Sequence, residues 1–596
     1  MVTGFFSDAG KAGRLILAFS LLFFVVSLVD AQEGPPTTNP PTATAKQPAA
    51  QPAVPSPPTV TPPPQPSTPV ALAIQALLKD GVHPKLRWKR FSDFQTPLEA
   101  LYQASGYDPL WIHDDKPTNQ ARLAVTSLGS ADDKGLDASD YDAESLKKWL
   151  GAINASTNTS PQELASFDSA LSISLMRYAY NLNNGRINPK QVNFALDIQP
   201  KSEDLPALLR KISTSSNPDK LLASMEPKLK LYDYLKDALA HYRQLAKEAP
   251  VAPIQLPNKF KPGDHHADVP KVRKLLSLLG DLTEGNANDA SQVYDKTLAE
   301  AVKRFQSRHG LTPDGVIGKT TLVQFNVPLA DRVKQIQLGL ERLRWLPEQI
   351  DGRYILVNIP SFQVYGYHNG SGADQPDLEM NVIVGEAIDG RNTPVFHSDM
   401  TYVNFRPYWN VPYAITLKEY VPILRRNPGY LGSHGMEIVN NFSPNATVYS
   451  ASAGNIQALA SGALKLRQRP GPKNALGLVK FAFPNTNNVY LHSTPSQGLF
   501  KRTRRDFSHG CIRVEYPVKM AEFVLKDQEE WTHERIEAAM QKDKPKIVTL
   551  KTPIPVYILY STVWADATGK AMFYNDIYGH DQILIDQLAK GFPYPM

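Results

Sequence analysis

The chain has 596 residues, of which 42% are hydrophobic and 20% charged, a composition typical of globular protein and sufficient for about four domains of ~150 residues each. Its net charge of +6 is small for this length, and no basic stripe is interleaved with aromatic residues, so nucleic acid is not expected as a partner. The single cysteine, Cys511, excludes an internal disulfide.

The N-terminus has the pattern of an export signal. Lys11 and Arg14 precede an uncharged apolar run from Leu15 to Val29, and small residues at Val29 and Ala31 suit cleavage after Ala31. Residues 1–31 are therefore either a cleaved signal peptide or an uncleaved membrane anchor, since the run is only slightly shorter than a spanning helix. Either interpretation places the rest of the chain outside the cytoplasm.

The next segment, residues 32–75, consists mostly of Pro, Thr, Ala, Gln and Ser. Such a composition cannot bury enough apolar surface to fold, and its prolines keep the backbone extended. We therefore predict a disordered linker that spaces the folded part of the chain from a membrane or a wall.

Residues 84–250 have a mainly helical pattern. Leu231, Leu235 and Leu239 recur at helical spacing and give one apolar face, while Gly- and Pro-containing turns separate the helical stretches. Nothing in this region indicates chemistry, so we predict a helical scaffold domain.

Residues 257–330 form a smaller predicted unit of amphipathic helices ended by glycines. The string from Ala301 to Leu311, followed by the turn Asp314–Gly318, resembles the three-helix peptidoglycan-binding domain of cell-wall enzymes. We expect Phe305 and Leu311 in its core, so the resemblance predicts the fold better than it locates a sugar site.

From about residue 350 the pattern changes to β-rich runs, which predict a mainly-β domain over residues 350–560. These runs are 354–359, 362–365, 381–385, 400–405, 488–491, 547–550 and 556–560, the last two completing the sheet. The composition between about 412 and 480 is more helical, which predicts an insertion into this domain. Residues 561–596 remain as a C-terminal segment.

Cys511 lies in the string Ser508-His509-Gly510-Cys511-Ile512-Arg513-Val514, and His492 ends a predicted strand shortly before it. A thiol attacks only as a thiolate, so it requires a base or a cationic environment near neutral pH. A histidine at a strand end beside a cysteine in a glycine-containing loop could supply that base. The alternative for a lone cysteine is an inert buried thiol.

The neighbours of Cys511 suggest further roles. Gly510 permits a tight turn that can aim backbone N–H groups at a developing oxyanion. Arg513 follows at the next position on the same side of an extended chain, where it could bind a carboxylate or hold the loop. The basic run Lys501–Arg505 either favours the thiolate and attracts anionic substrate or forms a solvated face.

Two observations test how specific this pattern is. The tripeptide recurs in Ser433-His434-Gly435-Met436, where methionine cannot act as a nucleophile, so Ser-His-Gly alone is a weak signal. His492, His509 and Cys511 are also possible zinc ligands, but a fourth ligand is not identified and the cationic neighbours disfavour a metal dication. We expect neither a metal nor another cofactor.

The complete pattern, a histidine followed at a short interval by Ser-His-Gly-Cys-x-Arg, closely resembles the L,D-transpeptidase catalytic domain, a β-sandwich that remodels bacterial peptidoglycan. The likeness is closest to the large periplasmic branch of that family and covers nearly everything after the linker. It implies a multidomain α+β protein with a helical scaffold, a peptidoglycan-binding-like domain and a mainly-β catalytic domain carrying a cap. Supporting segments are 384–394, 406–412, 467–472 and 474–477.

The resemblance also implies residue roles. Cys511 would be the acylated nucleophile and His492 its base. The implied supporting residues are His509 and Gly510 at the oxyanion site, Arg513, Tyr490 and Trp409 in substrate binding, and Ser493, whose carbonyl or hydroxyl could orient His492.

The implied reaction is a 3→3 crosslink made through a cysteine thioester with release of D-alanine. Water as the acceptor would instead give an L,D-carboxypeptidase, and a protein without the His492–Cys511 chemistry would be a wall-binding scaffold. The implied partners are peptidoglycan stem peptides and glycan, with possible association with the inner membrane. The implied location is the periplasm, and carbapenems are expected to acylate Cys511.

Overall fold

A computed structural model describes residues 64–594 except 197, 199, 249–251, 284–289 and 389. The predicted export signal and most of the predicted linker lie outside these residues. Within the described part of the chain, none of the helices combines the length and hydropathy needed to cross a bilayer. The multidomain α+β class predicted from the sequence is confirmed.

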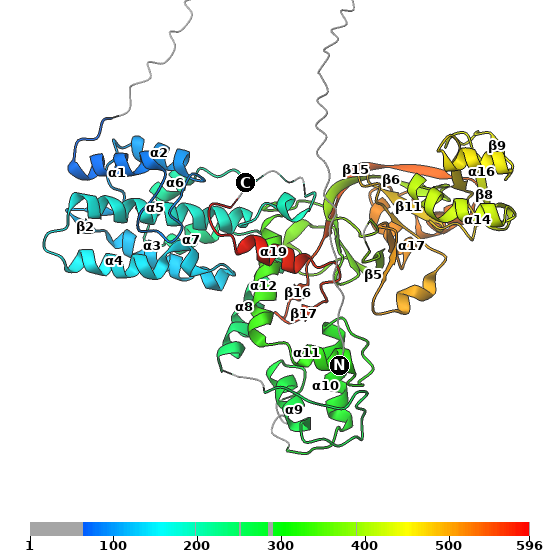
Figure 1. Ribbon diagram of the computed structural model, residues 1–596, viewed down its shortest axis with the longest axis horizontal. Helices are drawn as coiled ribbons and strands as arrows, with labels where there is room; N and C mark the ends of the chain where they lie inside the picture. Colours follow the sequence, from blue (N-terminus) through cyan, green and yellow to red (C-terminus); the bar gives the residue numbers. More distant parts are fainter. Residues whose placement is uncertain are drawn as a thin grey trace, which may run out of the picture. The chain divides into compact units, whose positions relative to one another are not determined.

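The first helical region has the long, buried helix α5 at its centre, with α1, α3, α4 and α6 packed against it (Figure 1). The helices are α1 Pro69–Asp80, α2 Gln95–Gln103, α3 Asn119–Gly129, α4 Ala143–Ala155, α5 Pro161–Asn184, α6 Leu205–Ile212, α7 Pro218–Ala223 and α8 Lys230–Glu248, with a small hairpin of β1 Ile112–His113 and β2 Lys116–Pro117. Helix α1 begins inside the segment predicted as linker. The Thr68 side chain caps its first turn and Pro69 fits the first helical position, so residues 69–75 are helical rather than extended.

The region from 257 to 330 has its own small apolar core around Val272, Leu276, Val302 and Phe305. Its helices are α9 Val269–Leu278, α10 Lys296–Arg308 and α11 Lys319–Phe325. As expected, Phe305 is buried in this core, but Leu311 is only partly buried and lies outside it. The chain then continues directly into α12 Leu329–Arg344, which packs along α8.

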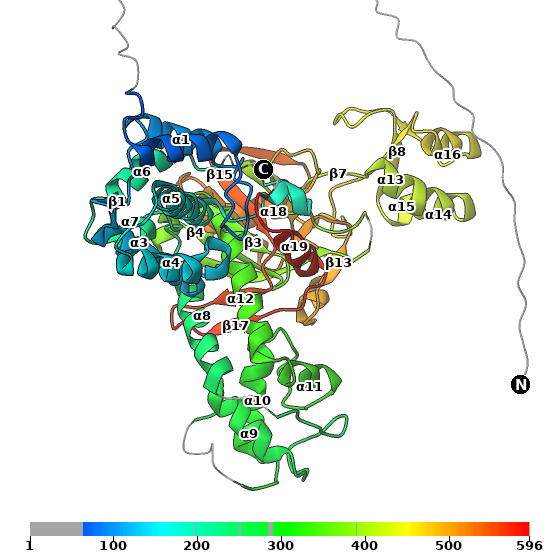
Figure 2. The ribbon, with the colours of Figure 1, turned by 60° about the vertical axis from the view of Figure 1, so that its left-hand side comes forward.

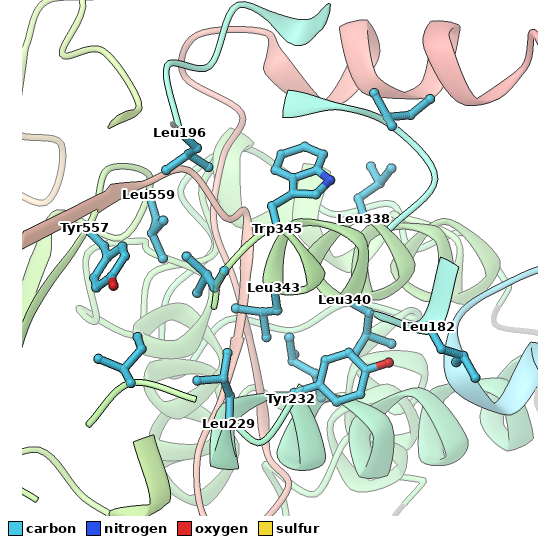
Figure 3. Close-up of a cluster of buried hydrophobic side chains, with 14 of the residues drawn as sticks. Leu182, Leu196, Leu229, Tyr232, Leu338, Leu340, Leu343, Trp345, Tyr557 and Leu559 are labelled. Carbon is cyan, nitrogen blue, oxygen red and sulfur yellow. The ribbon is translucent and has the colours of Figure 1, made fainter. Parts of the chain in front are cut away.

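Helix α12 joins the helical region to the β domain. Figure 3 shows its residues Leu338, Leu340 and Leu343 among side chains from α8, such as Tyr232, and from the strand that carries Leu559. These side chains are buried and belong to one continuous core. Apolar residues from both regions therefore leave water together, which stabilises their packing.

The β domain is built on a nine-stranded sheet in the order β13-β5-β14-β12-β11-β6-β15-β3-β4. An additional β4–β5 pairing closes the sheet on itself. Its strands are β3 Tyr354–Asn358, β4 Gln363–Tyr367, β5 Leu378–Gly385, β6 Phe396–Phe405, β11 Val479–Ala482, β12 Leu491–His492, β13 Asp506–Ser508, β14 Ile512–Val514 and β15 Lys546–Leu559. The two late strands expected from the sequence are one strand, β15, with an irregularity between Thr549 and Ile554.

Helices α17 Pro517–Leu525 and α18 His533–Gln541 follow the sheet's last short strands. The C-terminal segment contributes the hairpin β16 Val563–Ala565 with β17 Ala571–Phe573, and helix α19 His580–Leu588. This segment contacts the loop after β5, because the Tyr578 hydroxyl donates to the Gly385 carbonyl oxygen at 2.6 Å and accepts from the Thr393 N–H at 3.2 Å.

The predicted insertion is present as a separate subdomain with its own core, which we call the cap (residues 409–468; Figure 2). It contains a four-stranded sheet, β7 Trp409–Asn410, β10 Lys465–Gln468, β8 Met436–Val439 and β9 Val448–Tyr449, together with α13 Tyr413–Ile415, a π-turn at Thr416–Tyr420, α14 Val421–Arg426, α15 Tyr430–Ser433 and α16 Ala453–Ala460. The expected boundary near 480 is too late, because Val479 and Lys480 begin strand β11 of the main sheet, paired with β6 and β12.

The second Ser-His-Gly string lies inside the cap. Met436 is buried at the start of β8, and the His434 ring stacks on Tyr430 with centroids 3.8 Å apart. The string is therefore part of the packing of the cap and not of a reactive site.

Candidate active site

Strand register gathers five polar side chains on one face of the sheet. Strand β12 lies between β11 and β14, so His492 stands opposite both Lys480 and Arg513. Tyr490 lies two residues before His492 and Cys511 two residues before Arg513, each just ahead of its strand, and side chains two residues apart in extended chain share a face. All five line a cavity of about 1110 Å³ between the sheet and the cap.

Cys511 is partly exposed at the floor of this cavity. Its Sγ lies 3.7 Å from the Asn488 carbonyl oxygen, to which the thiol can donate. Burial raises the pKa of the Cys511 thiol, whereas hydrogen bonding from Tyr490 and the positive charges of Lys480 and Arg513 act in the opposite direction. The resting side chain is therefore a thiol at neutral pH.

His492 is buried and lines the same cavity, and its Nδ1 lies 2.5 Å from the Ser493 carbonyl oxygen. Of the two ways in which Ser493 could orient this ring, the structure therefore shows contact through the carbonyl. A carbonyl only accepts, so Nδ1 carries the proton and Nε2 is the basic nitrogen. Burial, followed by the charge of Arg513, lowers the pKa of His492 to about 3, so the imidazole is neutral at physiological pH.

The loop before Cys511 is fixed from two sides. Gly510 has φ 112°, a conformation that favours glycine, and its carbonyl accepts a hydrogen bond from Thr393 Oγ1 at 2.8 Å. Its own N–H donates to Ser508 Oγ at 3.2 Å and so already has an acceptor. Within the described residues, the N–H of Cys511 has none, which makes this amide the available donor for an oxyanion.

His509 is directed toward the cap. Its Nε2 lies 2.7 Å from Glu419 Oε1 of the π-turn, and Arg391 joins the same carboxylate at 3.0 Å. Arg391 also donates to Glu386 at 2.7 Å. The side chain of His509 thus joins the catalytic loop to the cap, and a role of this residue at an oxyanion site stays a prediction.

Trp409 enters the cavity from the cap. It lines the cavity together with Tyr490, and its ring meets Tyr420 edge-on with centroids 6.0 Å apart. Arg513 also lines the cavity, and its buried Nε has no hydrogen-bond partner among the residues that the structure describes. The three residues predicted to bind substrate are therefore brought together around Cys511.

Lys480 was not predicted as a site residue. Its Nζ lies 3.9 Å from the centroid of the Tyr490 ring, and burial lowers its pKa. The sequence analysis places residue 480 at the end of the cap, where a lysine does not indicate a functional site. The apolar run 478–483 could have indicated it, because a single lysine within an apolar strand suggests a polar position on one face of the sheet.

The basic run Lys501–Arg505 does not line the Cys511 cavity. Arg505 is buried and donates to the Phe362 carbonyl oxygen at 3.0 Å, and Arg504 binds Asp506 through two nitrogens. Lys501 and Arg502 are exposed. The positive charges that act on the thiol are instead those of Lys480 and Arg513.

Comparison with known families accounts for three regions of the chain. Residues 96–239 match a scaffold domain, residues 265–324 match a "Putative peptidoglycan binding domain", and residues 352–556 match an L,D-transpeptidase catalytic domain. The last match contains every residue of the cavity face described above.

Two curated relatives have similar sequences. A "Putative L,D-transpeptidase" of Haemophilus influenzae is 32% identical over 250 residues, covering 42% of this chain and 48% of that protein. The N-acetylmuramoyl-L-alanine amidase CwlM of Mycobacterium tuberculosis is 31% identical over 136 residues, covering 19% of this chain and 33% of that protein. The chain therefore spans about half the length of the first relative and a third of the second.

Proposed function

Because the chain carries an L,D-transpeptidase catalytic domain joined to a scaffold domain and a peptidoglycan-binding domain, we propose that it forms 3→3 crosslinks in peptidoglycan from a cysteine thioester. The observation that carries this proposal is the shared face of Cys511, His492, Lys480 and Arg513 in one open cavity. A buried structural thiol would not need an oriented, neutral histidine and two cations beside it.

In the first half-reaction, Cys511 Sγ attacks the carbonyl carbon after the third residue of a tetrapeptide stem while His492 Nε2 accepts the thiol proton. The carbonyl oxygen becomes an oxyanion that the Cys511 N–H can stabilise. When the C–N bond breaks, His492 returns the proton to the departing nitrogen, and D-alanine leaves behind a thioester. The side-chain amine of a second stem then attacks this thioester, loses a proton to His492, and the thiol is regenerated as the crosslink forms.

The substrate itself changes the electrostatics of the site. The donor stem ends in a carboxylate, and Arg513 and Lys480 are the lining cations whose charges act on the Cys511 thiol, so they are placed to bind it. Their charges help to lower the pKa of His492 in the free protein. An anion bound between them offsets that charge and raises the basicity of the imidazole when substrate is present. This arrangement keeps the thiol protonated until a stem peptide arrives.

The size of the cavity favours a second peptide as the acceptor. Sites for one small ligand typically measure about 300–1,000 Å³. The cavity here, about 1110 Å³, exceeds that range and extends to Trp409 and Tyr413 of the cap. It offers room for both a donor and an acceptor stem, which supports transpeptidation over hydrolysis. The family match and the export signal predicted from the sequence together support a periplasmic location.

The test is incubation of the full chain with defined tetrapeptide muropeptides, followed by mass spectrometry. We expect dimers linked 3→3 and released D-alanine, and a loss of activity of roughly 10³-fold or more in Cys511→Ala. Tripeptides without dimers would instead establish a carboxypeptidase. If neither dimers nor tripeptides form, the protein would be a wall-binding scaffold. A carbapenem adduct in the intact mass, absent from Cys511→Ala, identifies the nucleophile independently.

A further inference from the structure

A second cavity, of about 870 Å³, shares no lining residue with the Cys511 cavity. Three partly exposed tyrosines, Tyr234, Tyr367 and Tyr574, line it. Two further aromatic residues, Tyr365 and Trp564, stack on each other with centroids 5.1 Å apart and are almost fully buried in its wall. We call this the aromatic–basic cavity.

Planar polar and charged side chains complete its lining. The amides are Gln363, Gln375, Asn381 and Asn575, and the cations are Lys230, Lys501, Arg502, Arg504 and Arg505. Four carboxylates, Asp374, Glu379, Asp566 and Asp576, also line the cavity, and Lys230 and Arg504 each pair with a carboxylate, whereas Lys501 and Arg502 are exposed. Amide groups both donate and accept hydrogen bonds, and tyrosine presents an apolar ring with a polar edge. This combination suits a ligand with alternating apolar faces and polar edges, as in a pyranose sugar with acetamido groups.

The cavity is built from separate parts of the chain. Helix α8 supplies Tyr234, the residues matching the peptidoglycan-binding domain supply Ser307 and Leu311, and the catalytic domain supplies most of the rest. A hydrogen bond of 2.7 Å between Thr312 Oγ1 and Thr503 Oγ1 joins the second and third parts at the rim.

A third hollow, of about 570 Å³, connects this cavity to the reactive one. It shares Arg502, Thr503 and Arg504 with the aromatic–basic cavity and Ile388 with the Cys511 cavity. The middle hollow therefore adjoins both cavities through shared lining residues, and Glu386 and Asp506 line it together with the basic residues.

We propose that the aromatic–basic cavity binds the glycan strand of peptidoglycan and that the connecting hollow guides the attached stem peptide to Cys511. The inference rests on the proposed function, since it names the form in which the same substrate is presented. Sugar rings would pack on the tyrosines, acetamido groups would bond to the amides, and stem carboxylates would be drawn to Lys501 and Arg502. The basic run, which lies apart from the thiol, thereby acquires a role in binding the polymer.

The experiment compares the full chain with the charge-reversed variant Lys501→Glu/Arg502→Glu and with Tyr234→Ala. The matched control is Lys542→Glu/Lys544→Glu, which makes the same change in net charge at two exposed lysines outside all three hollows. The probes are soluble uncrosslinked glycan strands carrying tetrapeptides and the free tetrapeptide. Strand affinity is measured at low and high salt, and kcat/KM is measured on both substrates.

We expect the wild type to prefer the strand, and both test variants to lose at least about fivefold in strand affinity and in the strand-to-peptide ratio of kcat/KM. The control should retain both. Equal losses in the control and the charge-reversed variant, or wild-type strand and free peptide being used equally well, would overturn the inference. Failure of the proposed function is distinguishable, because the wild type would then form no 3→3 dimer from either substrate, whatever its strand affinity.

Discussion

At the scale of single residues, the cations Lys480 and Arg513 lower the pKa values of both His492 and Cys511. Lys480 stands opposite His492 in the strand register, and its charge lowers the pKa of both that imidazole and the Cys511 thiol. For the thiol this charge favours the reactive thiolate, whereas for the imidazole it disfavours the protonated form. Besides its proposed contact with the substrate carboxylate, Lys480 therefore sets the protonation states of its two neighbours.

Replacing Lys480 with methionine removes the charge and keeps much of the side-chain volume. The pKa of Cys511 should rise, because the cation that stabilised the thiolate is gone, and the pKa of His492 should rise as well. We expect alkylation of Cys511 by iodoacetamide at pH 7.5 to slow by roughly threefold or more, and its pH profile to move to higher pH.

Lys480→Arg, which keeps the charge, should restore most of the alkylation rate, and Lys473→Met, outside the cavity, should leave it unchanged. If Lys480→Met and Lys480→Arg slow alkylation equally, packing and not charge is the cause.

At the scale of elements, the cap meets the catalytic loop through one carboxylate. Glu419 on the π-turn contacts His509, two residues before Cys511, and Arg391 from the loop that follows β5. These groups are about one-third exposed, so each contact contributes modestly, on the order of 0.5–1 kcal/mol. Together they bias the cap toward the position seen here without locking it.

Glu419→Gln should weaken both contacts and increase opening of the cap by roughly three- to tenfold. We expect faster hydrogen exchange in 413–433 and a raised KM for stem peptide, with thermal stability nearly unchanged because few buried groups are affected. Arg425→Gln removes a bond to Gln457 that is internal to the cap and is the matched control. Equal exchange in the two variants would show that Glu419 does not hold the cap.

The elements also show what the sequence can and cannot predict. Periodicity located the helical regions, the β-rich region and the insertion, and the motif placed Cys511 and His492 in what the structure shows to be one cavity. Their catalytic roles stay predictions. The sequence does not predict Lys480 as a site residue, because the strand order β11-β12-β14 is set by long-range pairing. The alternation of residues within one strand does not reveal that order. The direction of His509 depends likewise on where the cap folds back.

At the scale of the whole molecule, a buried arginine connects the peptidoglycan-binding region to its surroundings. Arg308, at the end of α10, pairs with the buried Asp281, with Nε 2.9 Å from both carboxylate oxygens. The same guanidinium donates to the Tyr242 hydroxyl of α8 and to the Ala571 carbonyl oxygen of β17, each at 3.3 Å. Arg308 thus contacts both α8 and the C-terminal hairpin. The packing of residues 257–330 against these elements therefore depends on Asp281 neutralising the charge of Arg308.

Asp281→Asn should therefore leave a buried, unpaired cation and cost about 3–5 kcal/mol in the stability of this region. We expect hydrogen exchange to rise across 265–325 while the strands around Cys511 stay protected, and strand binding in the aromatic–basic cavity to weaken because Ser307 and Leu311 lose their fixed place. Replacing both partners, Asp281→Leu/Arg308→Met, should recover part of the stability, since neither charge of this pair is then left buried.

Lys303→Met, which breaks only the exposed pair with Glu300, should change stability by less than about 1 kcal/mol. If the double replacement is as unstable as Asp281→Asn, the loss comes from packing at this junction and not from an unpaired charge.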